Sequence, residues 1–139
     1  MLVKEVMTKN VVTIDRNDTA FDACNKYKEY KVGCLVVIDK GRCVGILTER
    51  DLIERTICAR KSPEKTKVGE IMSSSIKTVH ALETIDIALE IMRVNGIKKL
   101  PVIMNDEIVG IITVTDISKA RPELSKRFID SWVKPVWQD

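Results

Sequence analysis

The sequence has few aromatic residues and no long apolar run. Aromatic residues make up 4% of the 139 residues, so a folded core must be built mainly of aliphatic side chains. No apolar stretch approaches the roughly 18 to 20 residues of a membrane-spanning helix. The first residues, Met1 to Glu5, lack the charged and apolar regions of a signal peptide. These absences predict a cytoplasmic protein without a membrane partner.

Residues that carry chemistry are also scarce. The four cysteines lie in the first half of the chain without C-x-x-C spacing, which predicts reduced, mostly buried thiols. The single histidine, His80, has no acidic or cysteine pattern around it and is expected in an exposed loop after a short strand. No Ser-His-Asp order, H-E-x-x-H, P-loop or G-x-G-x-x-G occurs. The sequence therefore predicts no enzyme activity, no catalytic cofactor and no metal site.

The charges are nearly balanced. Lysine and arginine number 23 against 20 acidic residues, a formal charge of +3. This excess is too small to favour nucleic acid as a partner, although it leaves room for a local anion site. With 45% hydrophobic and 31% charged residues, the composition is that of one compact globular domain or two small units.

The chain contains an internal duplication. A shift of 65 residues places Gly45 on Gly110 and aligns Val3 to Lys119 with no gap. At this shift 14 of 52 aligned positions are identical, where average composition would give about three. The sequence therefore predicts two copies of one structural unit.

Each copy predicts the same order of elements. A short apolar segment precedes a brief strand, a helix beside a capping threonine, two strands joined by a tight turn, and a final helix. In the first copy these are Val3 to Met7, Val11 to Ile14, Thr19 to Glu29, Leu35 to Ile38, Cys43 to Thr48, and a helix from near Glu49. In the second they are Val68 to Met72, Ile76 to Val79, Thr84 to Val94, Leu100 to Met104, Ile108 to Thr113, and a helix from near Val114.

The duplication defines the expected domains and fold. Repeat 1 covers residues 1–58, a polar linker covers 59–67, repeat 2 covers 68–120, and a tail with a short helix covers 121–139. The fold class is α+β (mixed α/β), with two tandem β-α-β-β-α repeats. A copy of about 50 residues buries too little surface to be stable alone. We therefore expect the repeats to pack with pseudo-twofold symmetry around a shared cleft.

The strongest candidate for binding chemistry is a duplicated glycine-to-aspartate motif. Gly45 to Asp51 and Gly110 to Asp116 each run from a buried strand through a threonine to an aspartate at the start of a helix. The start of a helix suits a phosphate, and a carboxylate can accept hydrogen bonds from the vicinal hydroxyls of a ribose. The alternative is that Thr48 and Thr113 only cap their helices, while the two aspartates only complement the helix dipoles.

These motifs resemble the CBS domain, named after cystathionine β-synthase. The similarity rests on Val32 to Asp39 with Val44 to Asp51, and on Lys99 to Val102 with Gly110 to Thr113. It covers about residues 3 to 119 and implies a regulatory ligand-binding pair of repeats. In the family such pairs take AMP, ADP, ATP, S-adenosylmethionine or similar ligands, signal to a partner protein, and usually form dimers.

The resemblance also implies the ligand-binding residues. Asp51 and Asp116 would bind ribose, and Thr48 and Thr113 would contact ribose or phosphate. Lys98, Lys99 and Arg50 would lie near a phosphate, although for the lysines a role in solubility alone is the alternative. The residues expected to border the base pocket are Thr13, Gly33, Cys34, Leu35, Thr78, Leu100 and Pro101.

Two questions stay open at the level of sequence. The copies differ at the positions of Lys98 and Lys99, so a nucleotide can prefer either site. The tail holds both tryptophans, Trp132 and Trp137, which either cover their own module or dock on another subunit or a partner. The competing hypothesis to a ligand sensor with an unknown regulated protein is a structural protein-interaction module whose clefts are empty.

Overall fold

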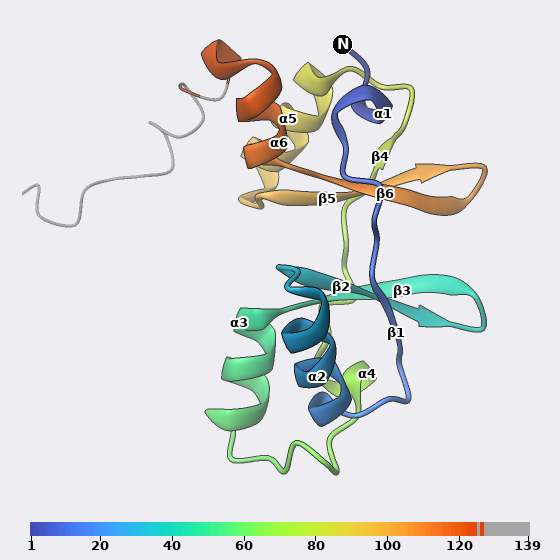
Figure 1. The fold of residues 1–139 in the computed structure, drawn as a ribbon, viewed down its shortest axis with the longest axis vertical. Coiled ribbons are helices and arrows are strands. Elements are labelled where there is room, and N and C mark those ends of the chain that lie inside the picture. The colour runs from blue at the N-terminus through green and yellow to red at the C-terminus, as the bar shows by residue number, and fades with distance from the viewer. Residues whose placement is uncertain (125, 127–139) are drawn as a thin grey trace, which may run out of the picture. The chain divides into compact units, whose positions relative to one another are not determined.

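The chain forms two compact units that do not coincide with the two sequence repeats. The computed structural model describes residues 1–124 and 126. One unit contains residues 11–76, and the other contains residues 1–10 with the chain from residue 77 onward. The first ten residues therefore belong to the unit built by the second repeat, and residues 68–76 belong to the unit built by the first (Figure 1).

The unit of residues 11–76 contains one sheet and its covering helices. Its elements are β1 (Thr13–Asp15), α2 (Ala20–Tyr30), β2 (Cys34–Asp39), β3 (Arg42–Thr48), α3 (Glu49–Leu52), the π-helical turn η1 (Ile53–Ile57) and α4 (Val68–Ile71). Strand β1 runs parallel to β2, and β2 runs antiparallel to β3. The expected strand-helix-strand-strand-helix order is confirmed, with the added short helix α4.

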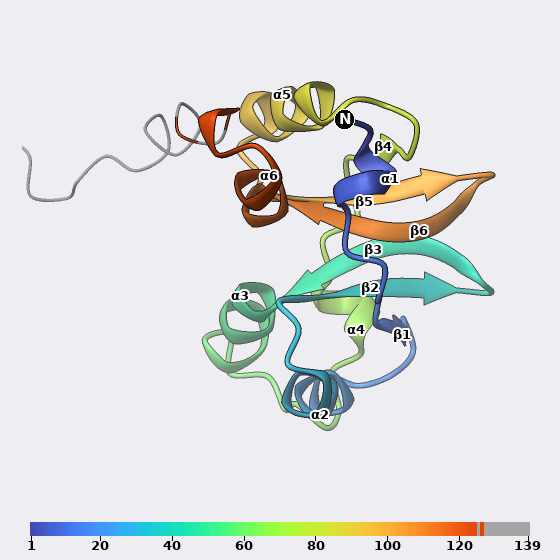
Figure 2. The ribbon, with the colours of Figure 1, turned by 45° about the horizontal axis from the view of Figure 1, so that its top comes forward.

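The second unit repeats this arrangement. Its elements are α1 (Val3–Val6), β4 (Val79–His80), α5 (Ile85–Asn95), β5 (Lys99–Met104), β6 (Glu107–Thr113) and α6 (Val114–Ala120). The sheet order is β4-β5-β6 with the same strand directions, and its register shift between Val102 and Ile103 matches that between Val37 and Ile38. Helices α5 and α6 lie on the same side of this sheet (Figure 2).

Strand β4 is shorter than expected, and Thr78 lies outside it. In the first sheet Thr13 pairs with Val36, whose N–H donates to the carbonyl of Val12. The residue at the corresponding position of β5 is Pro101, which has no N–H to donate. Pairing of β4 therefore starts only at Val79, and the expectation that Thr78 lies in the strand is wrong.

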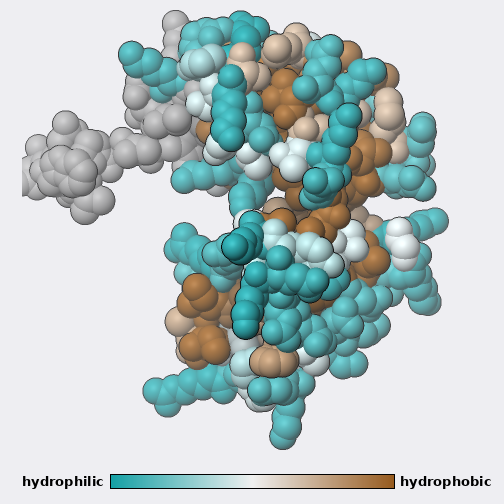
Figure 3. All heavy atoms as spheres, viewed as in Figure 1, coloured by the Kyte–Doolittle hydropathy of each residue, from teal (hydrophilic) through white to brown (hydrophobic). Residues whose placement is uncertain are grey.

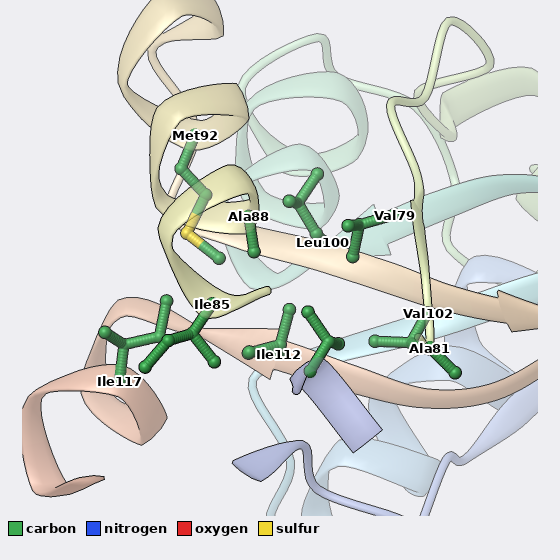
Figure 4. Close-up of a cluster of buried hydrophobic side chains, with 10 residues drawn as sticks. Val79, Ala81, Ile85, Ala88, Met92, Leu100, Val102, Ile112 and Ile117 are labelled. Atoms are coloured by element: carbon green, nitrogen blue, oxygen red, sulfur yellow. The ribbon is translucent and has the colours of Figure 1, made fainter. Parts of the chain in front are cut away.

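Each unit has its own aliphatic core. In the unit of residues 11–76 the cluster is formed by Ile14, Ala20, Ala23, Leu35, Val37, Leu47, Leu52, Val68 and Ile71. In the other unit α5, the sheet and α6 direct their apolar side chains toward one another (Figure 4). That cluster is formed by Val3, Val79, Ala81, Ile85, Ala88, Met92, Leu100, Val102, Ile112 and Ile117. The prediction of an aliphatic core is confirmed.

Capping and turn residues account for the boundaries of the larger elements. Thr19 and Thr84 accept hydrogen bonds from the third helical N–H of α2 and α5, and Gly96 ends α5 at a φ of 64°. Both hairpins turn on two residues with positive φ, Lys40-Gly41 and Asn105-Asp106, which is the pattern of a type I′ turn.

Some expectations about the cysteines and the histidine are wrong. Only Cys34 is buried: Cys24 on α2 and Cys58 in the turn after η1 are exposed, and Cys43 is half-buried. His80 lies in β4 rather than after it, and its Nδ1 accepts a hydrogen bond from the N–H of Leu82. Among the described residues no group of three or more histidine, cysteine or acidic side chains has the placement to hold a metal ion.

The surface carries mostly polar side chains, with a few apolar areas. Figure 3 shows one such area over α3 and η1, where Ile53 and Ile57 are 55% and 63% exposed. Within residues 1–124 and 126, no helix combines the length and apolar character required to span a membrane.

Candidate ligand-binding site

The glycine-to-aspartate motif forms the same local structure in both units. The N–H of Asp51 donates to the hydroxyl of Thr48, and Oδ2 of Asp51 accepts from the N–H of Thr48, both at 3.1 Å. Thr113 and Asp116 make the same reciprocal pair at 3.0 Å. The capping role is therefore real, and it orients each carboxylate at the end of its strand.

A second chain segment crosses each motif at its glycine. This crossing segment contains Ile71 to Ser73 in the unit of residues 11–76, and Met7 and Thr8 in the other unit. Ser73 exchanges two backbone hydrogen bonds with Ile46, of 2.8 and 2.9 Å, and Thr8 exchanges two of the same lengths with Ile111. The crossing is close because a Cβ on Gly45 would lie 2.7 Å from the carbonyl oxygen of Ser73. Glycine at this position therefore allows the second segment to reach the sheet.

The crossing segment brings a hydroxyl to each carboxylate. Thr8 Oγ1 donates to the carboxylate of Asp116, at 3.3 Å from Oδ1 and 3.4 Å from Oδ2. Ser73 Oγ lies 3.5 Å from Oδ2 of Asp51. We refer to Thr8, Thr113 and Asp116 as the Asp116 cluster, and to Thr48, Asp51, Arg55 and Ser73 as the Asp51 cluster.

The Asp51 cluster also contains a cation. The Nη2 atom of Arg55 lies 3.6 Å from Oδ1 of Asp51, and its Nη1 atom donates to the backbone carbonyl of Ile71 at 3.0 Å. The same Nη1 donates to the carbonyl of Met72 at 3.1 Å and to Ser73 Oγ at 3.4 Å. Arg55 therefore joins η1 to the crossing segment and to the carboxylate.

A tyrosine of α2 contacts the strand that leads into the Asp51 cluster. The hydroxyl of Tyr27 donates to the backbone carbonyl of Leu47 on β3. Burial raises the pKa of Tyr27 above its usual value, and nearby Cys34, Glu49 and Asp51 raise it further by Coulomb repulsion. Tyr27 therefore stays a neutral donor that supports the strand carrying the motif.

The residues that form the two motifs also lie within segments that match a known protein family. Residues 3–57 and 68–123 each match the CBS domain. The chain belongs to the CBS-domain family.

Several relatives and solved structures match most of the chain. Protein MK0525 of Methanopyrus kandleri is 32% identical over 88% of this chain, which spans 63% of that protein's length. The conserved CBS-domain protein TA0289 of Thermoplasma acidophilum is 32% identical, with a TM-score of 0.80 over 91% of this chain and 76% of that chain. The CBS-domain pair of protein MJ0100, solved with 5′-methylthioadenosine and S-adenosyl-L-methionine, is 27% identical, with a TM-score of 0.78 over 89% of this chain and 98% of that chain.

The structure brings some of the expected CBS ligand residues together in each unit. Cys34 pairs with Thr48 across the first sheet, and Lys99 pairs with Thr113 across the second. Both strand starts therefore lie beside an aspartate cluster. The backbone carbonyl of Lys98 accepts a hydrogen bond from the N–H of Val114, which ties the preceding residue to the same helix start.

Other expected ligand residues have internal partners. The side chains of Leu35 and Leu100 are completely buried in the two cores. Arg50 points to solvent on α3 and pairs with Glu54 at 2.8 Å. The carbonyl of Thr13 accepts a hydrogen bond from Lys26. Thr13 and Gly33 are both exposed.

Three residues of the clusters were not expected from the sequence: Thr8, Ser73 and Arg55. Thr8 and Ser73 occupy equivalent positions at the 65-residue shift, directly after the aligned methionines Met7 and Met72. The presence of a hydroxyl residue at both equivalent positions is the feature of the sequence that could have identified Thr8 and Ser73. Arg55 has no such signal, because its counterpart in the second repeat is Ala120.

The capping pairs support a prediction about stability. Replacing Thr48 or Thr113 with valine keeps the side-chain shape but removes the hydroxyl that accepts the helical N–H. We expect each change to lower the free energy of unfolding by about 1 kcal/mol, the usual value of an N-cap. Chemical denaturation measures this, with Thr115→Val as a control at an exposed position of α6. Equal stability of all three variants would contradict the capping role.

Proposed function

We propose that this CBS-domain protein is a regulatory module that binds an adenine nucleotide or another adenosyl ligand, and that Asp51 and Asp116 accept its ribose hydroxyls. The observation that carries the proposal is the repeated carboxylate, fixed by a threonine cap and joined by a hydroxyl from a second segment. The ligands in the structure of MJ0100 share an adenosyl group, which supports this class of ligand.

A carboxylate of this kind retains the capacity to bind a diol. A carboxylate has about four lone-pair positions on two oxygens. In Asp116 the backbone N–H of Thr113 and the hydroxyl of Thr8 use part of this capacity. Two vicinal hydroxyls can use the rest, and the cap has already fixed the orientation of the acceptor. The aspartate side chain is therefore already ordered before binding, and no binding free energy is lost in ordering it.

A ligand screen tests the proposal. A ligand that binds only the native state raises the melting temperature, by an amount set by its concentration relative to its Kd. We expect AMP, ADP, ATP or S-adenosylmethionine to raise the melting temperature of the full chain. NAD, a ligand with two riboses, is included in the screen for comparison. The absence of a shift with all of them at millimolar concentration would favour the structural interaction module instead, for which the exposed Ile53 and Ile57 are a candidate contact surface.

The two aspartates are each expected to serve one site. In Asp51→Ala and Asp116→Ala the site in the altered unit loses its charged acceptor. We expect binding at that site to weaken by at least about 1 kcal/mol, the net value of a typical hydrogen bond. Titration calorimetry measures this, and Asp86→Ala, at an exposed position in the first turn of α5, is the control. The ribose assignment is wrong if neither variant differs from the control.

Lys98 and Lys99 are expected to discriminate ligands by phosphate number. Lys99 lies opposite Thr113 at the start of β5, where its charge favours a more anionic ligand. Replacing both with alanine should weaken the binding of ATP and ADP more than that of adenosine, and added salt should reduce the difference. Equal losses for the three ligands would show that the lysines only shape the site.

Signalling to a regulated protein and assembly as a homodimer complete the proposal. Both derive from the family resemblance. The Trp-containing tail lies mostly outside the described residues, so its docking on a subunit or partner stays a prediction. Light scattering on the full chain and on a chain truncated after Arg121 tests whether the tail contributes to the dimer.

A further inference from the structure

Arg55 occupies the side of the Asp51 carboxylate that a ligand hydroxyl would need. Its guanidinium lies 3.6 Å from Oδ1 of Asp51, while Oδ2 already faces the N–H of Thr48 and the hydroxyl of Ser73. The Asp51 side chain is 13% exposed. A vicinal diol can therefore reach this carboxylate with both hydroxyls only after the guanidinium moves.

The guanidinium is held by more than the ion pair. Its Nη1 donates to the carbonyls of Ile71 and Met72 at 3.0 and 3.1 Å. Hydrogen bonds from a charged donor are stronger than those between neutral groups. Moving Arg55 therefore breaks contacts to the crossing segment as well as the contact to Asp51. The side chain is 47% exposed, so water and salt reduce the strength of the ion pair.

In the part of the chain that the structure describes, no arginine occupies the equivalent place in the Asp116 cluster. The position that corresponds to Arg55 is Ala120, and none of the ion pairs found within residues 1–124 and 126 involves Asp116. Its partners are the N–H of Thr113 and the hydroxyl of Thr8, which rotates without cost to its backbone contacts. Of the partners that the structure describes for Asp116, none is a charged side chain that a diol would have to displace.

We propose that Arg55 ranks the two sites, so that the adenosyl ligand fills the Asp116 site first and the Asp51 site only at higher concentration. This inference rests on the proposed function, because it concerns the same two carboxylates. It makes Arg55 a specificity-determining residue that acts through Asp51. The duplicated fold then responds to ligand in two concentration ranges, although the two motifs are nearly identical in sequence.

Titration calorimetry of the full chain with AMP tests the ranking. In the wild-type protein we expect a tight and a weak site. In Arg55→Met the weak site should tighten by about three- to fivefold, as expected from the loss of a partly exposed ion pair, while the tight site stays unchanged. Asp116→Asn should remove the tight site and leave the weak one. The control is Arg93→Met, which breaks the exposed pair of Arg93 with Glu90 on α5 and should change neither site.

A second variant, Arg55→Gln, tests the same prediction with a smaller expected effect on stability. Arg55→Gln removes the charge but keeps amide donors for the carbonyls of the crossing segment, so its weak site should tighten as well if Arg55→Met is too unstable to titrate. Weaker binding of AMP in both variants, with unchanged binding of adenosine, would show that Arg55 contacts the phosphate and would overturn the ranking. An unchanged weak site in both variants would also overturn it. If the wild-type protein binds another ligand of the screen but not AMP, the same titrations are made with that ligand, and the absence of binding of all of them would instead refute the proposed function.

Discussion

Leu100→Ala is expected to lower the free energy of unfolding by about 2 to 5 kcal/mol, the range for a large-to-small change in a packed core. Leu100 is completely buried on the central strand β5, among side chains of α5, β6 and α6 (Figure 4). Its truncation removes apolar contacts and leaves a cavity that the rigid sheet cannot fill. Denaturant unfolding followed by circular dichroism measures the loss.

The duplication supplies a matched variant for this experiment. Leu35 occupies the equivalent position of β2 and is equally buried in the core of the other unit. Leu35→Ala should therefore cost a similar free energy. Leu82→Ala is the control, because Leu82 is 50% exposed and should change stability by less than about 0.5 kcal/mol. A cost for Leu100→Ala or Leu35→Ala no larger than that of the control would show that the clusters are not the cores.

The elements of the fold were predictable because local patterns define them. Apolar residues at helical spacing, threonine caps and tight turns each act within a few residues of chain. The sequence therefore predicts the ends of α2, α5 and both hairpins to within one residue. The loss of Thr78 from β4 had a local signal as well. Pro101 stands on the central strand, and its missing N–H was visible in the sequence.

The exchange of the leading segments between the units was not predictable from the repeats. The segments ending in Thr8 and Ser73 are similar, and each fits against a glycine on a strand followed by a threonine. Either segment therefore suits either sheet on local grounds. In the structure Ser73 pairs with Ile46 and Thr8 with Ile111, α4 contacts β3, and α1 contacts α5, α6 and β6. These are tertiary effects, which residue patterns do not encode directly.

The same reason explains which part of the candidate site was found. Thr48, Asp51, Thr113 and Asp116 are close in sequence and form a capping pattern, so they were identified together. Arg55 was not, because its role depends on the position of a segment that follows it by 16 to 18 residues. The contacts on which its proposed ranking role rests are known only once the crossing segment is placed.

Gly110→Ala adds a single methyl group, and we expect it to be among the most destabilising substitutions of that size in the chain. A Cβ at this position would lie 2.8 Å from the carbonyl oxygen of Thr8 and 2.6 Å from the sulfur of Met7, where ordinary contact begins at about 3.4 Å. The sulfur ends a flexible side chain and can move, but the carbonyl belongs to a backbone that exchanges two hydrogen bonds with Ile111. We expect a loss of about 1 to 3 kcal/mol in the free energy of unfolding, as for overpacked sites.

Combined variants separate the effects of the two close contacts and test whether this glycine affects the proposed ligand site. If the carbonyl of Thr8 is the obstacle, adding Met7→Ala should not restore the stability of Gly110→Ala. Gly45→Ala should lower the free energy of unfolding by a similar amount, because its Cβ would lie 2.7 Å from the carbonyl of Ser73. Gly41→Asn is the control: its turn has open space and a φ of 79°, which asparagine tolerates. Because displacement of Thr8 removes the hydroxyl beside Asp116, Gly110→Ala should also weaken AMP binding at that site. A stable Gly110→Ala variant with unchanged AMP affinity would show that the crossing segment adapts without cost and does not form part of the site.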